Sequence, residues 1–160
     1  MTIKIRTMIK KDRPALVKIL RNTPEFKPAE IVVAEEVIES FLDDPQGSGY
    51  HLLIAEYDSN VAGYICYGPT PMTEGTWDLY WMAVTPEKQG RGIGSSLMTF
   101  AEEQIKKAGG RLALIETSAM PAYDKARRLH ACHGYEEIAR VPDFYAIGDD
   151  KLILQKRLRG

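Results

Sequence analysis

Three alternate glycines stand in the segment Val84-Thr85-Pro86-Glu87-Lys88-Gln89-Gly90-Arg91-Gly92-Ile93-Gly94-Ser95-Ser96. A β-rich run, Thr76–Val84, leads into this segment, and apolar residues spaced for one face of a helix continue from it to Ala108. Glycine lets the backbone approach a ligand without a Cβ in the way. The first N–H groups of a helix lack partners within it and carry partial positive charge. The segment therefore predicts a strand, a loop and a helix, with the loop placed to bind a pyrophosphate.

Two common nucleotide-binding loops do not match this segment. A Rossmann loop requires G-x-G-x-x-G after an early strand and an acidic residue about 20 residues later, whereas the spacing here is G-x-G-x-G after several predicted strands. A Walker loop requires Gly-Lys-Ser or Gly-Lys-Thr, and the sequence contains neither. The sequence therefore excludes both a Rossmann loop and a Walker loop at this segment.

Upstream of the glycines, the sequence predicts a strand, two helices and a hairpin. Alternating apolar residues over residues 3–9 predict the strand, and Asp12 followed by Pro14 predicts the N-cap and first turn of a helix. A second helix is expected from about Pro28 to Asp43, where apolar residues form one stripe. The hairpin is predicted from two β-rich runs around a tight turn: Tyr50–Tyr57, Asp58-Ser59-Asn60 and Val61–Tyr67.

Downstream of the glycines, helices and strands alternate. The helix that begins near Ile93 is expected to stop at Gly109-Gly110, and a helix over Pro121–His133 to stop at Gly134. Short strands are expected at Leu112–Ile115 and Lys151–Leu158. This order predicts an α/β fold with a mixed sheet and helices on both of its faces.

The composition is that of a globular protein. The 160 residues are 44% apolar, 27% charged and 9% aromatic, which argues against disorder, fibres and membrane proteins, and one domain over residues 1–160 is expected. The only two cysteines, Cys66 and Cys132, favour free thiols in a reducing compartment, and no metal site is suggested. The N-terminus lacks the apolar core of a secretory signal, and no run approaches about 20 apolar residues. We therefore expect a cytoplasmic protein with no membrane partner.

Charge is distributed unevenly, although the net charge is only −1. Residues 22–78 contain eleven acids and one base, Lys27, whereas residues 81–160 contain thirteen bases and ten acids. Two interpretations stay open: a solvated acidic helix face, or a field that attracts a cationic acceptor while the more basic half meets an anionic cofactor. A nucleic-acid partner is disfavoured because no dense basic stripe with interleaved aromatics is present.

The glycine segment resembles the acetyl-coenzyme A loop of the GNAT superfamily of N-acetyltransferases, Q/R-x-x-G-x-G/A, which is met here as Gln89-Gly90-Arg91-Gly92-Ile93-Gly94. The resemblance implies a GNAT-like mixed central sheet of about six to seven strands. It also implies that loop amides bind the pyrophosphate and that the preceding strand offers its backbone to the pantetheine arm and the thioester carbonyl. The cofactor-binding residues expected from it are Met82, Ala83, Val84, Gln89, Gly90, Arg91, Gly92, Ile93, Gly94, Ser95, Tyr123 and Ala126.

A second motif of the family, Asn-x-x-Ala-x-x-x-Tyr-x-x-x-Gly-Phe, is similar to residues 123–135. Ala126, Gly134 and Tyr135 match it. Tyr123 stands where asparagine usually contacts pantetheine, and His130 stands where tyrosine usually protonates the departing thiolate. By its position in the motif, His130 is the preferred acid, because imidazole has an unperturbed pKa near 6.5; Tyr123 and bulk water are the alternatives.

Acetyl transfer to an amine also requires a route for the amine proton. Strand alternation places Asp78 and Tyr80 on one face with Met82 and Val84, so that either Asp78 or Tyr80 is a candidate base. Glu116, near the end of the next strand, is the other candidate. Tyr145, in a predicted loop over residues 142–150, is a candidate for lining the acceptor pocket, and His51 and His133 are expected to be structural or exposed.

The function expected from the resemblance is acetyl transfer from acetyl-coenzyme A to a primary amine by direct attack on the thioester. The acceptor is expected to be a cationic small molecule or peptide, and a homodimer is left open. Two alternatives remain: a catalytically silent sensor of acyl-coenzyme A that controls a partner protein, and a transferase that uses another acyl donor.

Overall fold

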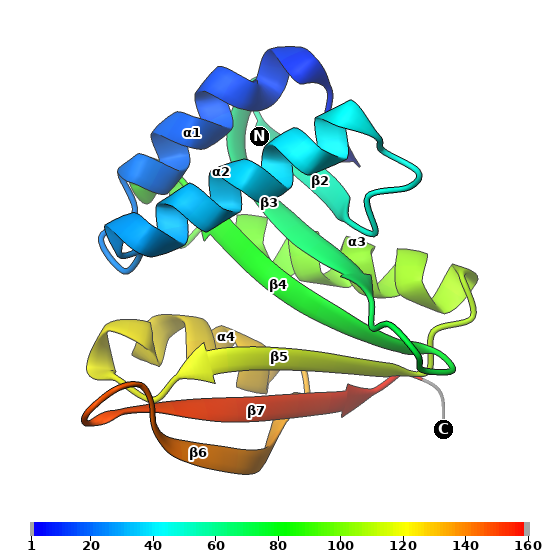
Figure 1. Cartoon of the computed structure of the whole chain (residues 1–160). Coiled ribbons are helices and arrows are strands. Elements are labelled where there is room, and N and C mark those ends of the chain that lie inside the picture. Colours follow the sequence, from blue (N-terminus) through cyan, green and yellow to red (C-terminus); the bar gives the residue numbers. More distant parts are fainter. Residues whose placement is uncertain (1, 159–160) are drawn as a thin grey trace.

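The computed structural model describes residues 2–158 and shows a seven-stranded mixed sheet with helices on both faces (Figure 1). The strand order is β1-β2-β3-β4-β5-β7-β6, and the neighbouring strands are antiparallel except for β4 and β5, which are parallel. The predicted α/β fold, a mixed sheet of about six to seven strands with helices on both faces, is confirmed. The strands and α-helices are β1 (Ile3–Thr7), α1 (Arg13–Arg21), α2 (Pro28–Asp43), β2 (His51–Tyr57), β3 (Asn60–Pro69), β4 (Thr76–Val84), α3 (Ile93–Lys107), β5 (Leu112–Ser118), α4 (Asp124–Cys132), β6 (Glu136–Ala146) and β7 (Asp149–Arg157).

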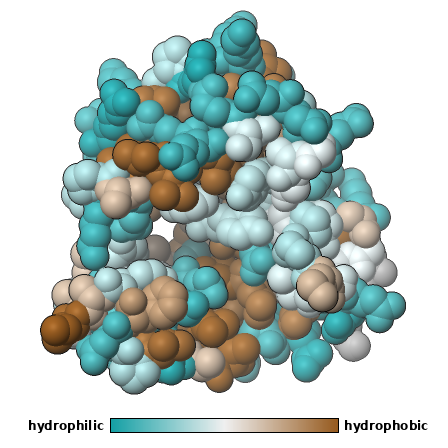
Figure 2. Space-filling view, in the orientation of Figure 1, coloured by the Kyte–Doolittle hydropathy of each residue, from teal (hydrophilic) through white to brown (hydrophobic). Residues whose placement is uncertain are grey.

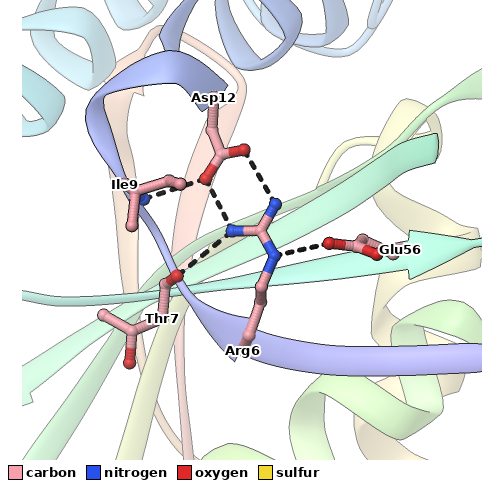
Figure 3. Close-up of polar contacts among 5 residues, drawn as sticks. All are labelled: Arg6, Thr7, Ile9, Asp12 and Glu56. Atoms are coloured by element: carbon pink, nitrogen blue, oxygen red, sulfur yellow. Dashed lines mark hydrogen bonds and ion pairs between the residues drawn. The ribbon is translucent and has the colours of Figure 1, made fainter. Parts of the chain in front are cut away.

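The start of α1 is fixed by a cluster of charged side chains. Asp12 stands at the predicted N-cap position, but its carboxylate accepts hydrogen bonds from Arg6 Nη1 (2.8 Å) and Nη2 (2.9 Å) and from the Ile9 amide (2.9 Å) (Figure 3). Arg6 Nε also donates to Glu56 Oε2 at 2.5 Å. The Arg6 guanidinium holds the pKa of the buried Asp12 carboxyl below its ordinary value. The cluster therefore joins β1 and β2 to the start of α1.

The sequence predicted one of the two hairpins well and the other poorly. β2 and β3 form the expected hairpin, and Asp58 and Ser59 in its turn have φ angles of 50° and 71°, the left-handed conformation that tight hairpin turns require. β6 and β7 form a second hairpin, whereas a loop was predicted over residues 142–150. That prediction was wrong because β6 is an edge strand that is exposed along its whole length. Its sequence therefore lacks the alternation of apolar and polar residues that indicates a strand.

The core lies in two layers, one on each face of the sheet. α3 covers one face, and α1 and α2 cover the other (Figure 1). The α3 layer includes Leu97 and Ile105 packed on strand residues such as Ile65, and the α1–α2 layer includes Leu16 and Ile38. With both layers buried, the sheet is a rigid support for the segments that extend from its strand ends.

The sheet opens between β4 and β5. These two strands pair only from Thr76 with Leu112 to Leu79 with Ile115, and they diverge beyond that point (Figure 1). β4 also contains an extra residue, Tyr80, because Cys66 of β3 pairs with Trp81 while Tyr67 pairs with Leu79. A β-bulge of this kind reverses the direction of the side chains that follow it.

Candidate active site

A cavity of about 720 Å³ occupies the opening between β4 and β5. Figure 2 shows the hollow between the part of the molecule that carries α1 and α2 and the part that carries β5 and β7. The cavity is lined by the connection between α1 and α2, the end of β4, the glycine segment, the end of β5, the start of α4 and the β6–β7 hairpin. The predicted site residues that line it are Tyr80, Met82, Ala83, Val84, Gln89, Gly90, Gly92, Ile93, Gly94, Ser95, Glu116, Tyr123, Ala126 and His130.

One end of the cavity, called here the glycine end, is the segment Gln89–Ser95. Gly92 is the N-cap of α3 with φ 82°, and Gly90 has φ 80°, so both use a conformation that favours glycine. A Cβ built on either residue would meet no atom within 4 Å, which leaves open space beside the main chain. Gly94 differs from these two glycines because a Cβ added there would lie only 3.1 Å from Leu129 Cδ2. The absence of a side chain at Gly94 therefore lets α3 pack closely on α4. The segment thus presents helix N–H groups to an open space, as an anion requires.

Side chains hold the glycine end in place and add positive charge. Gln89 Nε2 donates to the Val84 carbonyl (3.2 Å), and Gln89 Oε1 accepts from Lys125 Nζ (3.1 Å). Lys88 and Lys125 both line the cavity, and neither was predicted. Arg91, which was predicted to bind the cofactor, does not line the cavity; its guanidinium donates to the Tyr57 hydroxyl (3.2 Å) and lies over that ring.

The end of β4 offers main-chain groups to the cavity. Met82, Ala83 and Val84 pair with β3 along one edge, and their other edge faces the opening because β5 pairs with β4 only as far as Leu79. The predicted common face of Asp78, Tyr80, Met82 and Val84 was wrong: the bulge at Tyr80 turns Met82 and Val84 toward the α3 layer, while Tyr80 packs on the α1–α2 layer.

The predicted bases on β4 do not behave alike. The Asp78 carboxylate accepts hydrogen bonds from Thr70 Oγ1 (2.6 Å) and from the Tyr80 hydroxyl (3.5 Å). Asp78 is not among the cavity-lining residues, and it is linked to the cavity by the Tyr80 hydroxyl. Tyr80 lines the cavity, but burial, and then the Asp78 charge, raise its pKa to about 12. At neutral pH this phenol keeps its proton and is a poor base.

The opposite end, called here the carboxylate end, is lined by Glu25, Glu30, Glu116 and Asp149. Glu116, the third predicted base, is paired with Lys151 (Nζ to Oε1, 3.0 Å). The other three were not predicted as site residues. The acidic surplus of residues 22–78 was a signal for Glu25 and Glu30, whereas Asp149 reaches the cavity only because the β6–β7 hairpin folds beside β5.

Two tyrosines stand beside these carboxylates. The Tyr123 hydroxyl donates to the Glu25 carbonyl (2.9 Å) and lies 3.5 Å from Glu30 Oε1, so it reaches across the cavity from α4 to the connection between α1 and α2. Burial, and then Glu30 and Asp149, raise its pKa to about 12. Tyr145 lines the cavity as its predicted role requires, and burial and Glu116 raise its pKa to about 12.

His130 lines the cavity on the α4 side, but its surroundings argue against an acid there. Burial, and then the charge of His133, lower the pKa of His130 to about 4, and its Nδ1 atom is buried without a hydrogen-bond partner within residues 2–158. The imidazole is therefore neutral near pH 7, contrary to the protonated donor that the sequence suggested. His133 is bonded to Ser95 (Nε2 to Oγ, 2.8 Å), and the exposed His51 stacks on Tyr67.

Two further features bear on the class of site. Across residues 2–158, no group of three or more His, Cys, Asp or Glu side chains is placed to hold a metal ion. None of the helices described is long and apolar enough to cross a membrane.

Comparisons with known proteins agree with this geometry. The Acetyltransferase (GNAT) family model matches residues 14–135. A Desulfovibrio desulfuricans protein assigned to the GNAT family is 37% identical, with a TM-score of 0.93 over 98% of this chain and 99% of that chain. Among curated proteins, none matches the sequence significantly.

More distant structures share the fold. The ribosomal-protein-S18-alanine N-acetyltransferase from Escherichia coli is 19% identical, with a TM-score of 0.79 over 99% of this chain and 96% of that chain. A Salmonella typhimurium protein whose structure contains its cofactor acetyl-CoA is 20% identical, with a TM-score of 0.76 over 99% of this chain and 95% of that chain.

Proposed function

The chain belongs to the GNAT family of acetyltransferases, and we propose that it transfers the acetyl group of acetyl-CoA to the primary amine of a cationic acceptor. One observation carries this proposal: a single cavity joins the glycine end, with the start of α3 and two lysines, to the carboxylate end across the open edge of β4. An anionic donor and a cationic acceptor would each meet opposite charge, and their reacting groups would meet between the two ends.

The glycine end fits the diphosphate of the donor. Gly90 and Gly92 leave space beside the main chain, the first N–H groups of α3 face it, and Lys88 and Lys125 supply positive side chains. The main chain of Met82–Val84 offers hydrogen bonds to the pantetheine arm. The Salmonella structure with acetyl-CoA supports the same donor on this fold.

Direct attack is the mechanism best supported by the side chains. The neutral amine attacks the thioester carbonyl carbon, the C–S bond breaks, and one proton leaves the amine while the thiolate takes one up. Backbone N–H groups of β4 are suited to the oxyanion that forms. No covalent enzyme intermediate is supported, because Cys66 is buried with its pKa raised by burial and Cys132 is not among the cavity-lining residues.

Proton transfer is assigned to residues at the carboxylate end. Tyr123 is preferred over His130 as the donor to the thiolate. The Tyr123 phenol keeps its proton at neutral pH, whereas the His130 imidazole is not protonated to imidazolium at that pH. The hydroxyl of Tyr123 would exchange its bond to the Glu25 carbonyl for one to sulfur. Glu116 is the predicted carboxylate base that lines the cavity, and it accepts the amine proton directly or through water.

Release of free coenzyme A thiol, measured with acetyl-CoA and a library of amines, tests the proposal. Steady release with primary amines that carry extra positive charge is the expected result. Tight acetyl-CoA binding without release for any amine would contradict it and favour the silent sensor. Release with a longer acyl-CoA in preference to acetyl-CoA would favour another donor.

A further inference from the structure

An ion pair crosses the carboxylate end of the cavity. Lys27, just before α2, places Nζ 3.3 Å from Asp149 Oδ2, at the first residue of β7. The second oxygen of this carboxylate, Oδ1, accepts a hydrogen bond from Ser118 Oγ at 2.5 Å. All three residues line the cavity. Asp149 is thus oriented by the wall of the cavity and already holds one ammonium group.

The two partners of this ion pair differ in how firmly they are held. The Asp149 side chain is 11% exposed and is fixed by the buried Ser118, whereas the Lys27 side chain is 57% exposed. A lysine this exposed gains little from an ion pair, about fivefold or less in an equilibrium constant, because water solvates it almost as well. Lys27 can therefore leave at small cost, but the Asp149 carboxylate stays and requires another cation.

The neighbouring charges increase that requirement. Glu25, Glu30 and Glu116 line the same end, and Lys27 is the one lysine or arginine that lines it within residues 2–158. Lys151 neutralises Glu116 from outside the cavity and lies over the Phe144 ring at 4.0 Å. After Lys27 leaves, no lysine or arginine among the described residues that line the carboxylate end balances its negative charge.

Asp149 lies on a different wall of the cavity from the expected position of the thioester. Asp149 and Ser118 lie on β7 and β5, on the wall opposite the open edge of β4. Because the thioester is expected along β4, an ammonium group bound at Asp149 lies across the cavity from the thioester and is not the amine that attacks it. We propose that Asp149 binds a second, non-reacting ammonium group of the acceptor, and that Lys27 occupies this position until the acceptor displaces it. This inference rests on the proposed function, and it narrows the acceptor to amines that carry an additional cation.

Variants of the two partners distinguish this inference from a structural ion pair. Lys27→Met removes the competitor, so it should strengthen binding of a diamine two- to fivefold, the worth of an exposed ion pair. Asp149→Asn removes the site, so it should weaken binding about tenfold or more, as expected for one lost hydrogen bond to a charged group. In the Asp149→Asn background, Lys27→Met should have no effect. If the ion pair were purely structural, both single variants would change the affinity for the diamine in the same direction.

The test is a calorimetric titration of 1,5-diaminopentane, with pentylamine as the one-cation comparison, into each variant saturated with coenzyme A. The expected result is that the dissociation constant of the diamine falls in one single variant and rises in the other, while that of pentylamine changes in neither. Shifts in the same direction, no shift, or equal shifts for both amines would overturn the inference. Because binding needs no turnover, a chain that binds the diamine but releases no thiol would refute the transferase proposal and leave this site standing. Affinity for coenzyme A should be the same in all variants.

Discussion

The glycine end of the cavity is made largely of main chain from one continuous segment, whereas the carboxylate end is made of side chains from the α1–α2 connection, β5 and β7. The first presents helix N–H groups and two lysines, and the second presents four carboxylates and one displaceable lysine. Under the proposed function, the main-chain groups would bind a feature common to all coenzyme A donors, and the side chains would determine which acceptor binds. Changes at the two ends should therefore separate into effects on the donor and effects on the acceptor.

Tyr123, which stands at the start of α4 beside the carboxylate end, should show the largest effect. General acid catalysis contributes about 10²–10⁴-fold, so Tyr123→Phe should lower kcat by that range, while His130→Gln should change it less than about threefold. Tyr145→Phe is the matched control, since that phenol also lines the cavity with a pKa of about 12 but lies on β6. The measurement is kcat for thiol release from about pH 5 to 9.

The pH profile adds an independent criterion. A donor with a pKa of about 12 leaves no falling limb near pH 6.5, and neither does a histidine whose pKa is about 4. A falling limb near pH 6.5 that disappears in His130→Gln would restore His130 as the acid and contradict the assignment of Tyr123.

A buried neutral histidine on the α4 wall predicts a pH effect on stability. The pKa of His130 is about 4 in the folded chain and near 6.5 in the unfolded chain, so the unfolded chain binds more protons between these values. Stability should therefore fall as the pH drops from 6.5 to 4, by up to about 3 kcal/mol from this one group. Urea unfolding at pH 7.5 and 4.5 should show a smaller loss for His130→Gln than for the unmodified chain. Equal losses would mean that the imidazole is protonated when folded.

The difference between the two ends also explains what the sequence could predict. The glycine end lies within one segment whose spacing and flanking elements are local, so the helix start near Ile93 and the position of the segment after β4 were predicted correctly. The spacing does not show where the Arg91 side chain lies, because that depends on Tyr57, a residue from a distant part of the chain. The general order of strands and helices followed from the same kind of local pattern.

The carboxylate end could not be assembled in the same way. Glu25 and Asp149 are separated by more than a hundred residues and meet only after β7 pairs with β5. Strand alternation failed for Asp78 and Met82 because a single bulged residue, Tyr80, shifts the pattern, and no local residue type marks a bulge there. The pKa of His130 depends on burial by neighbours from other elements, which the motif does not contain.

Ser95→Asp should damage only the glycine end. A carboxylate beside a diphosphate costs about 2 kcal/mol at an effective dielectric of about 20 or more, so affinity for coenzyme A should fall about 30-fold by calorimetry. Ser96→Asp is the matched control, because it adds the same charge to the same first turn of α3 but Ser96 does not line the cavity. Both variants should fold well, since acidic residues favour a helix N-terminus. Gly92→Val is a poorer probe because φ 82° strains a branched residue. Equal losses in the two serine variants would show that the segment does not contact the diphosphate.

Ionic strength should give the smallest effect and the most direct comparison of the two ends. Opposite charge attracts each substrate to its own end, and the Debye length shortens from about 10 Å at 0.1 M salt to about 3 Å at 1 M. The KM values for acetyl-CoA and for a diamine acceptor should therefore both rise a few-fold over this range, while pentylamine, with no second cation to be attracted, should change less. Initial rates of thiol release at the two salt concentrations provide both values. If only the KM for acetyl-CoA rises, the carboxylates of Glu25, Glu30, Glu116 and Asp149 do not attract the acceptor, and a preference for neutral or anionic amines in the same assay would assign this end of the cavity to another class of substrate.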